Sequence, residues 1–385
     1  MRAQFLPYNL PDLGEDEEVA VLETLRSHWI SRGPQTDLFE QDLSAYLQGA
    51  TVVALSSCTA GMHLALLALG IGPGDEVITT PYTFAASVNV IIHAGATPVL
   101  VDVEEDTANI NMAQVEDALT ERTKAILPVH YSGHPVDLSA LNRLRDTYHL
   151  PIIEDAAHAL ASTYDGKKVG TFGNLTSFSF YATKNLTTGE GGALVVPDEE
   201  LAQKIRVLSL HGMSHHAWNR YGESGSWVYS VEAAGFKYNM TDIQASLGRV
   251  QLAKLTRMQA KRRWIAEQFH QAFRDLPVIL PAQRTGVEHA WHLYPLRLQL
   301  SALRISRAEF VEALKARNIG ASVHFIPIHW HPYYQERFHW QPGQFPVAER
   351  YFNGEVSLPL YPSMSEQDVD DVIAAVREIL LSHLK

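Results

Sequence analysis

The chain has 385 residues, a formal net charge of -12 at pH 7 and a single cysteine, Cys58. Its acidic surface repels nucleic acid and anionic membranes, so neither is expected as a partner, and one cysteine excludes an internal disulfide. The N-terminus lacks a basic segment followed by an apolar one, and no apolar stretch is long enough to span a bilayer, so we expect a cytoplasmic enzyme.

The first half of the chain alternates between short strands and helices. Two helices are predicted within 15–48, separated by a turn at Gly33-Pro34. From residue 50 onward, β-branched segments predict strands and apolar residues at helical spacing predict the helices between them. This alternation predicts an α/β fold with a mostly parallel sheet covered on both faces. The expected strands are 51–55, 76–80, 97–103, 124–131 and 150–155, and the expected helices are 58–70, 84–95 and 138–149.

The second half follows a different pattern. Strands are predicted at 176–183 and 192–196, on either side of a loop rich in Gly and Thr. A long helical pattern covers 241–275, and two strands and two helices follow it. We place the domain boundary inside the long helix, which gives a large α/β domain at 1–253 and a small α+β domain at 254–385. The late strands are expected at 292–300 and 320–327, and the late helices at 306–317 and 365–384.

Lys184 and Asp155 are the first candidates for chemistry. Lys184 follows an apolar strand, and a desolvated lysine has a lowered pKa and a free amine that can form a Schiff base. A surface lysine that opens a loop would show the same local pattern. Asp155 ends a strand of the predicted sheet, at the edge where α/β sheets bind ligands, and would either pair with a protonated pyridine nitrogen or cap a helix. His158 lies one helical turn further and would contact a ring substituent or pack in the core.

Two further segments are suited to a phosphorylated aromatic ligand. A strand ends in small hydroxyl residues before a helix, and the free amides and dipole of a helix start favour a phosphate. Ser57, Thr59 and Ala60 are the candidates there, although a plain capped helix start would look the same. Tyr82 and Phe84 follow another strand, where an aromatic side chain would stack on a flat ring or pack in the core.

Three patterns in the sequence imitate binding motifs but lack the context that such motifs require. The glycines at 70–74 lie after a helix and before a strand, the reverse of a dinucleotide-binding context, and no Gly-Lys-Ser/Thr follows the TGEGG segment as a phosphate loop would require. Two groups of histidines lack any recognised metal-ligand spacing, so we expect no metal. These groups are His211, His215 and His216, and His324, His329 and His331.

Together these segments resemble the DegT/DnrJ/EryC1/StrS family of pyridoxal 5'-phosphate (PLP)-dependent sugar aminotransferases. The resemblance runs nearly end to end and includes IEDAAHA, FSFYATKNLTTGEGG, FKYNMTDIQASLGRVQL and HLYPLRL. It implies the PLP-dependent transferase fold type I, PLP as cofactor, and a homodimer with shared active sites. Within the family, the chain is most similar to nucleotide-sugar 4-aminotransferases such as the UDP-4-amino-4-deoxy-L-arabinose aminotransferases.

The resemblance also implies roles for individual residues. Lys184 would hold PLP and move a proton between the cofactor and the sugar, Asp155 would pair with the pyridine nitrogen, and His158 would lie near the phenolic oxygen. The phosphate would be bound by Ser179, Thr59 and Ala60, and by Asn239 from the neighbouring subunit. Phe84 fits the stacking aromatic better than Tyr82. The candidate substrate-binding residues are separate from the resemblance: His324 and His329 would line the substrate pocket or have a structural role, and the basic residues Arg32 and Lys237 would meet a diphosphate.

The predicted reaction transfers an amino group from L-glutamate to a keto group, expected at C4, of a nucleotide-linked sugar. A PLP-dependent lyase or amino-acid aminotransferase of the same fold, and a non-catalytic regulatory protein, are the alternatives. Two positions depart from the family pattern: Cys58, which replaces a frequent Gly and brings an oxidisable thiol near the cofactor, and His134, which replaces a frequent Gln and bears on specificity. Lys184 argues against the family's 3-dehydratases, which have His in its place.

Overall fold

A computed structural model describes residues 2–214 and 229–385, so His215 and His216 lie outside the described residues. Its largest feature is a twisted sheet in the order β3-β2-β4-β5-β8-β9-β1, in which isolated parallel bridges from Ile126 to Ile152 and from Val129 to Asp155 join two smaller sheets. Only β9 runs antiparallel to its neighbours, so the predicted mostly parallel sheet is confirmed. The strands are β1 (Thr51–Leu55), β2 (Glu76–Thr79), β3 (Thr97–Leu100), β4 (Thr123–Ile126), β5 (Ile153–Asp155), β8 (Leu175–Ser179) and β9 (Gly192–Val196).

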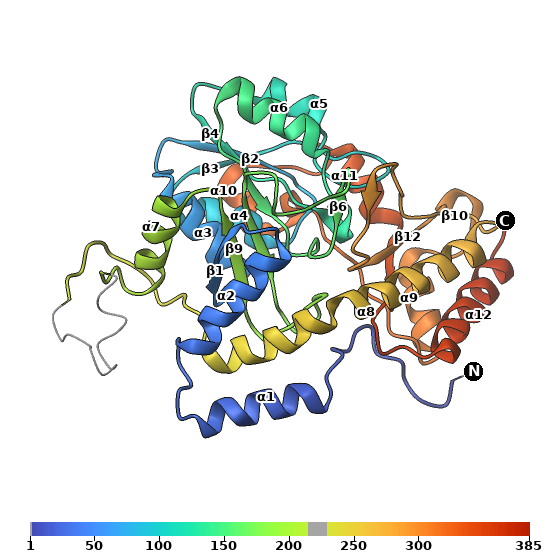
Figure 1. The fold of residues 1–385 in the computed structure, drawn as a ribbon. Helices are drawn as coiled ribbons and strands as arrows, with labels where there is room; N and C mark the ends of the chain where they lie inside the picture. The colour runs from blue at the N-terminus through green and yellow to red at the C-terminus, as the bar shows by residue number, and fades with distance from the viewer. Residues whose placement is uncertain (1, 215–228) are drawn as a thin grey trace.

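Helices cover both faces of this sheet (Figure 1). Alternate residues of one strand enter different cores: Val52 and Ala54 pack in one cluster, and Val53 and Leu55 in the other. Strands buried on both faces need apolar residues at every position, which explains why TVVAL shows no polar alternation. The first core receives α2 (Pro34–Tyr46), α6 (Leu138–Tyr148) and the first half of α8 (Asp242–Phe273), and the second receives α3 (Cys58–Ala68), α4 (Ala85–His93) and α7 (Glu199–Ser209).

The C-terminal part forms a separate core around a small antiparallel sheet of order β10-β12-β13. A third sheet, β11-β6-β7, lies between the two parts of the sequence and pairs residue 287 with residue 164. The elements are β10 (Val278–Ile279), β12 (Tyr294–Leu298), β13 (Glu355–Leu358), α9 (Arg307–Lys315), α10 (Pro332–Phe338), α11 (Pro346–Gly354), α12 (Glu366–Ser382), β6 (Thr163–Tyr164), β7 (Lys167–Lys168), β11 (Val287–Glu288), and the short α5 (Met112–Val115) of the large sheet region.

Helix α8 contributes to both cores. Leu255 and Met258 pack in the large core, whereas Ile265 belongs to the small one. The N-terminal Leu6 also packs in the small core and forms a β-bridge with Ile319, although the predicted boundary places residue 6 in the large domain. The division at 253/254 stays a prediction.

The prediction of a strand at 320–327 is wrong. Only Ser322 forms a β-bridge in this segment, with Ser357 of β13. Two residues later, the amide of His324 donates to the carboxylate of Glu355 at 2.9 Å. Because a side chain takes the place of the ladder acceptor, the segment leaves the sheet after one bridge. The second late strand is β13 instead.

Asp242, the first residue of α8, holds the start of α2 in place. Its buried carboxylate accepts hydrogen bonds from the amides of Gly33 at 2.7 Å, Gln35 at 3.0 Å and Thr36 at 3.0 Å, and from the Thr36 hydroxyl at 2.6 Å. This network explains why Gly33-Pro34 separates the first two helices so sharply. The side chain of Asp242 thus satisfies the amides that a helix start leaves without intrahelical partners.

We therefore expect Asp242→Asn to lower the free energy of unfolding by about 2–3 kcal/mol, because an amide NH₂ would face one of these donors. Urea unfolding followed by circular dichroism measures the change. Asp42→Asn is the matched control, since that carboxylate is 41% exposed and pairs with Arg249 on the same helices. Equal midpoints for the two variants would contradict the assigned role of Asp242.

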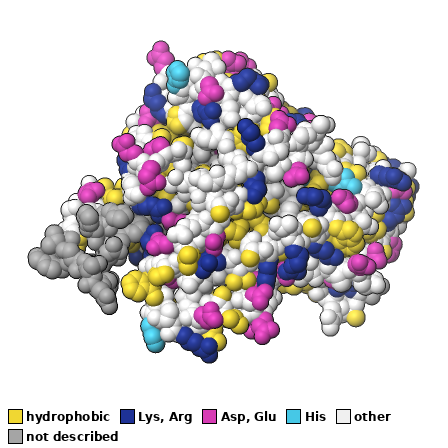
Figure 2. Space-filling model, viewed as in Figure 1, with side chains coloured by type: hydrophobic (Ala, Val, Ile, Leu, Met, Phe, Trp, Pro, Cys, Tyr) yellow, Lys and Arg dark blue, Asp and Glu magenta, His cyan; other side chains and the backbone are white. Residues whose placement is uncertain are grey.

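Apolar side chains are exposed along α1 (Glu15–Arg26), on the face that Figure 2 shows. Val19, Leu22 and Leu25 are each between 44% and 46% exposed and lie on one side of the helix. None of the described helices is both long and apolar enough to cross a membrane.

Candidate active site

Several of the predicted site residues lie at the carboxyl edge of the large sheet. Asp155 ends β5, Ser179 ends the parallel strand β8, and Ser57 precedes α3 just after β1. Parallel strands end at the same edge, and ligands of such sheets bind there. Asp155 is linked to α4 by the hydroxyl of Ser87, which donates to its Oδ2 at 2.7 Å.

The carboxylate of Asp155 is fixed on both oxygens. Besides Ser87, the amide of Ala157 donates to Oδ1 at 3.1 Å, and Sγ of Cys58 lies 3.8 Å from the same oxygen. The thiol also donates to the carbonyl oxygen of Ser177 at 3.2 Å. Burial and the Asp155 charge raise the pKa of the Cys58 thiol well above its usual value, so it stays protonated at neutral pH. Since the thiolate is the reactive form, the thiol near the predicted cofactor site is protected from oxidation.

Lys184 carries a partly neutral amine at physiological pH. Burial lowers its pKa to about 8, and the negative charge of Asp155, which acts on the amine, partly opposes this shift. Nζ also lies 3.5 Å from Nε2 of His292, which the sequence marks only as the start of a predicted strand. A lysine with a lowered pKa and a neighbouring carboxylate is what Schiff-base chemistry requires.

His158 is buried beside Lys184 in its neutral form. Its Nδ1 accepts a hydrogen bond from the amide of Ser132 at 3.2 Å, so its proton resides on Nε2. The ring packs against His292 at a centroid distance of 4.3 Å and Phe325 at 5.9 Å. Burial, and secondarily the Lys184 charge, lowers the pKa of His158 well below its usual value. A neutral donor of this kind suits a phenolic oxygen, the role that the resemblance implies.

The start of α3 offers a mixed set of phosphate donors. The Ala60 amide already donates to the Ser57 hydroxyl at 3.0 Å, whereas Thr59 is exposed. Ser179 is half-buried, and its hydroxyl accepts from the Tyr181 amide at 3.4 Å. The Ser57 cap therefore competes with the expected use of the Ala60 amide, and the phosphate roles of Thr59, Ala60 and Ser179 stay predictions.

A glycine lets β9 approach this helix start. A Cβ on Gly192 would lie 2.4 Å from the amide nitrogen of Cys58 and 2.7 Å from the carbonyl oxygen of Phe178. Both contacts are with backbone atoms, which cannot move aside without moving the helix start or the strand. The GEGG segment thus shapes the edge of the site rather than a phosphate loop.

The two candidate aromatics have different environments. Tyr82 is fully buried and its hydroxyl donates to the carbonyl oxygen of His324 at 2.7 Å, which ties the large sheet to the small domain. Phe84 is 63% exposed, next to Phe325 at a centroid distance of 6.0 Å. An exposed ring at this edge can stack on a flat ligand, and the stacking role of Phe84 stays a prediction.

Asn239 lies beside β1 of its own chain. It bridges to Leu55, and its Nδ2 donates to the carbonyl oxygen of Met240 at 3.0 Å. Its Oδ1 is buried and has no hydrogen-bond partner among the described residues. Buried polar atoms are rarely left without a partner. Its predicted contact with a neighbouring subunit's phosphate is untested.

The three candidate substrate residues do not gather at one place. His324 is partly exposed near Lys184, its Nδ1 lies 2.9 Å from the Ser357 hydroxyl, and burial lowers its pKa to about 4. His329 is fully buried and pairs with Glu349 at 2.8 Å, so the structure gives it a packing role instead of a place in the substrate pocket. Arg32 pairs with Asp37 at 3.0 Å and Glu40 at 3.8 Å at the start of α2.

His134, the other departure from the family pattern, lies in the interior. It is 2% exposed, and its Nδ1 bonds to the carbonyl oxygen of Pro135 at 2.7 Å. Burial lowers its pKa to about 4, so it is neutral. Across residues 2–214 and 229–385, no three His, Cys, Asp or Glu side chains are grouped so as to hold a metal ion.

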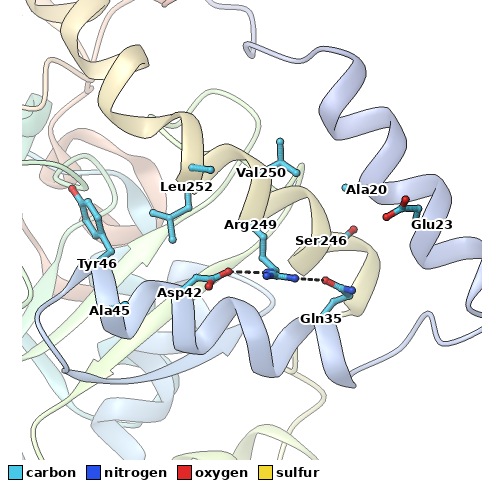
Figure 3. Close-up of a pocket in the computed structure, with 11 residues that line it drawn as sticks. Ala20, Glu23, Gln35, Asp42, Ala45, Tyr46, Ser246, Arg249, Val250 and Leu252 are labelled. Carbon is cyan, nitrogen blue, oxygen red and sulfur yellow. Dashed lines mark hydrogen bonds and ion pairs between the residues drawn. The ribbon is translucent and has the colours of Figure 1, made fainter.

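A separate groove of about 580 Å³ lies between α1, α2 and α8 (Figure 3). Arg249 crosses it, with Nε 2.7 Å from Asp42 and Nη1 3.0 Å from Gln35. None of the predicted site residues lines it. The groove is therefore distinct from the cluster around Lys184.

Comparison with known proteins decides the family. Residues 11–377 match the DegT/DnrJ/EryC1/StrS aminotransferase family. The chain belongs to this family. It is 52% identical over 381 residues to the spore coat polysaccharide biosynthesis protein SpsC of Bacillus subtilis, covering 98% of each chain.

Solved structures agree with this assignment. The putative sugar aminotransferase Spr1654 from Streptococcus pneumoniae, in its PMP form, has a TM-score of 0.92 and 35% identity, with 98% of this chain and 99% of that chain covered. PseC of Helicobacter pylori, an aminotransferase involved in the biosynthesis of pseudoaminic acid, has a TM-score of 0.90 and 31% identity, covering 98% and 100%. The predicted family, fold type and enzyme class are confirmed: the chain is a PLP-dependent aminotransferase of this family. Spr1654 has also been solved in a PLP form, so the predicted cofactor is that of the family.

Proposed function

We propose that this aminotransferase holds PLP on Lys184 and moves an amino group from L-glutamate to the C4 keto group of a nucleotide-linked sugar. One observation carries the proposal: the amine of Lys184, with a pKa lowered to about 8, shares the carboxyl edge of the sheet with the fixed carboxylate of Asp155. A plain surface lysine would have neither the burial nor the neighbour.

The residues at this edge suit the shape and charge of PLP. Asp155 presents a carboxylate for a protonated pyridine nitrogen, Phe84 offers an exposed ring face, and the N-terminus of α3 favours a phosphate. PLP, when bound, supplies an electron sink that stabilises negative charge on the carbon next to the transferred nitrogen. His158 would donate from Nε2 to an oxygen of the ring.

Lys184 would act as the proton carrier once its amine is free. A group with a pKa close to the working pH both accepts and returns a proton efficiently. The lowered pKa of Lys184, about 8, meets this condition. The fixed carboxylate of Asp155 would keep a positive charge on the ring nitrogen during the transfer.

The donor and the acceptor are the finer parts of the proposal. Sugar substrates are supported by the names of two relatives, SpsC in polysaccharide biosynthesis and PseC in pseudoaminic acid biosynthesis. The nucleotide and C4 amination follow from the resemblance to nucleotide-sugar 4-aminotransferases, and L-glutamate is the donor by family analogy.

A homodimer with shared sites is also proposed. The stripe of exposed apolar residues on α1 is of the kind that a subunit interface covers, and the buried Oδ1 of Asn239 lacks a partner within the described chain. Light scattering of the purified protein measures the mass. A monomer at micromolar concentration would exclude sharing of sites between subunits.

Spectroscopy with a substrate panel tests the function. The protein with PLP should absorb as a Schiff base, and L-glutamate should convert it to the pyridoxamine form. That form is then offered 4-keto and 3-keto sugar nucleotides, and a keto sugar without a nucleotide, with return to PLP as readout. Return only with 4-keto sugar nucleotides supports the whole proposal. A cofactor indifferent to glutamate but converted by another amino acid favours an amino-acid aminotransferase or lyase, and failure to bind PLP removes every enzymatic version.

The same apoprotein gives a pH-dependent prediction. Only the neutral amine of Lys184 attacks PLP, so the rate of PLP capture should rise with pH through a midpoint near the lowered pKa of about 8. Stopped-flow absorbance across pH 6–11 measures it. A midpoint at the ordinary lysine value of 10.5 would contradict the effect of burial.

A further inference from the structure

A chain of hydrogen bonds runs from α8 to the amine of Lys184. Gln259 on α8 donates from Nε2 to the carbonyl oxygen of His289 at 3.0 Å, and its Oε1 accepts from Nδ2 of Asn185 at 3.3 Å. Oδ1 of Asn185 lies 3.2 Å from Nδ1 of His292, whose Nε2 lies 3.5 Å from Nζ of Lys184. Gln259, Asn185 and His292 are between 5% and 7% exposed.

The direction of every bond in this chain is determined. Nδ2 of Asn185 also meets the carbonyl oxygen of Ala290 at 2.7 Å. A carbonyl oxygen only accepts, so this end of the amide must be the NH₂ group and the other end must be the oxygen. That oxygen in turn requires a proton on Nδ1 of His292. Nε2 of a neutral His292 is then a lone pair that points at a donor.

The surroundings keep this imidazole neutral. Burial lowers the pKa of His292 well below its usual value, and His158, Lys184, Arg262 and His324 add to the effect. Its backbone is fixed as well, since its amide donates to the carbonyl oxygen of Ser132 at 3.0 Å. A lone pair held rigidly in a buried position gives the lysine amine one preferred place.

We propose that His292 is a positioning residue whose Nε2 accepts a hydrogen bond from the free amine of Lys184, with Asn185 and Gln259 fixing the required tautomer. The inference rests on the proposed function, because Lys184 carries protons only when its amine is free. Proton transfer depends steeply on geometry, so a held amine works faster than a mobile one. A neutral acceptor does this without placing a second positive charge beside the lysine.

Two substitutions test the roles of the two imidazole nitrogens separately. His292→Gln places an amide group near the former Nε2 position, where its oxygen can accept from Lys184. His292→Asn reaches only the Nδ1 position and leaves the amine without that acceptor. We expect the Asn variant to lower the kcat of the glutamate half-reaction by about 100-fold with little change in KM, because a misplacement near 1 Å has that effect. The Gln variant should recover most of this loss, and His331→Asn, at the partly exposed start of α10, serves as the control.

A second readout uses the apoprotein. An acceptor stabilises the ammonium form of lysine more than the amine, so its loss should lower the pH midpoint of PLP capture in His292→Asn but not in His292→Gln. A role limited to folding would change the thermal midpoint without this difference. Equal kinetics and equal capture midpoints for the Asn variant and the unaltered protein would overturn the inference.

The tautomer itself is measurable without an active variant. Histidine labelled with ¹⁵N in the apoprotein, with the signal assigned by its loss in His292→Gln, should show protonation on Nδ1. Protonation on Nε2 would refute the proposed bond even if His292→Asn failed to fold. If the unaltered protein captured no PLP, the proposed function would fail first, which distinguishes the two cases.

Discussion

Lys184→Ala should abolish the absorbance of the PLP Schiff base and reduce amino transfer by about 10⁴-fold, the upper range for loss of a proton-transfer group. The substitution removes both the covalent attachment and the amine that moves the proton. The side chain lies in no regular element, between β8 and β9, so the effect on stability should be small. Borohydride reduction of the PLP-loaded protein, followed by mass spectrometry of its peptides, locates the attachment directly.

Lys204→Ala is the matched control, because this lysine on α7 donates to the carbonyl oxygen of Ala68 at the C-terminal end of α3, whereas the candidate site lies at the N-terminal end of that helix. It should retain the spectrum and the rate. If borohydride fixed PLP onto another lysine of Lys184→Ala, and this variant transferred amino groups as fast as the unaltered protein, the assignment of Lys184 as the attachment site would be wrong.

The placement of Lys184 and Asp155 at one edge of the sheet could be predicted because their signal is local. Asp155 ends one strand of the expected sheet and Lys184 follows another, and topology alone brings the ends of such strands together. The strands themselves were readable from runs of apolar residues, since both faces of the sheet are covered. The same reasoning failed for the segment GASVHFIP at 320–327, which has the composition of a strand. It leaves the sheet after one bridge, because the amide of His324 donates to the carboxylate of Glu355 instead of to a backbone oxygen.

Residues that reach the site through space left no such signal. Ser87 contacts Asp155 from 68 positions away, and His292 contacts Lys184 from 108 positions away. Neither lies in a pattern that marks it, because a histidine before a strand or a serine in a helix is ordinary. His329 shows the opposite case: the sequence left it between the substrate pocket and a structural role, and its full burial and its pairing with Glu349 favour the structural role.

Asp155→Asn should lower the rate of amino transfer by about 10³-fold while leaving the fold intact. The neutral amide fits the existing hydrogen bonds: its oxygen can accept from Ala157, and its NH₂ can donate to Ser87 Oγ. Ser87 can turn its own proton toward Thr83, whose hydroxyl oxygen lies 2.8 Å away. What is lost is the negative charge that would hold a proton on the ring nitrogen.

The two effects of this substitution go in opposite directions, which makes the prediction sharp. The Asp155 charge raises the pKa of Lys184, so its removal should move the midpoint of PLP capture below about 8 and speed capture at neutral pH. Amino transfer should nevertheless slow, because the ring would no longer be kept protonated. Asp146→Asn, an exposed carboxylate on α6, should change neither quantity. If Asp155→Asn slowed capture and transfer together, the carboxylate would act by shaping the site instead of by its charge.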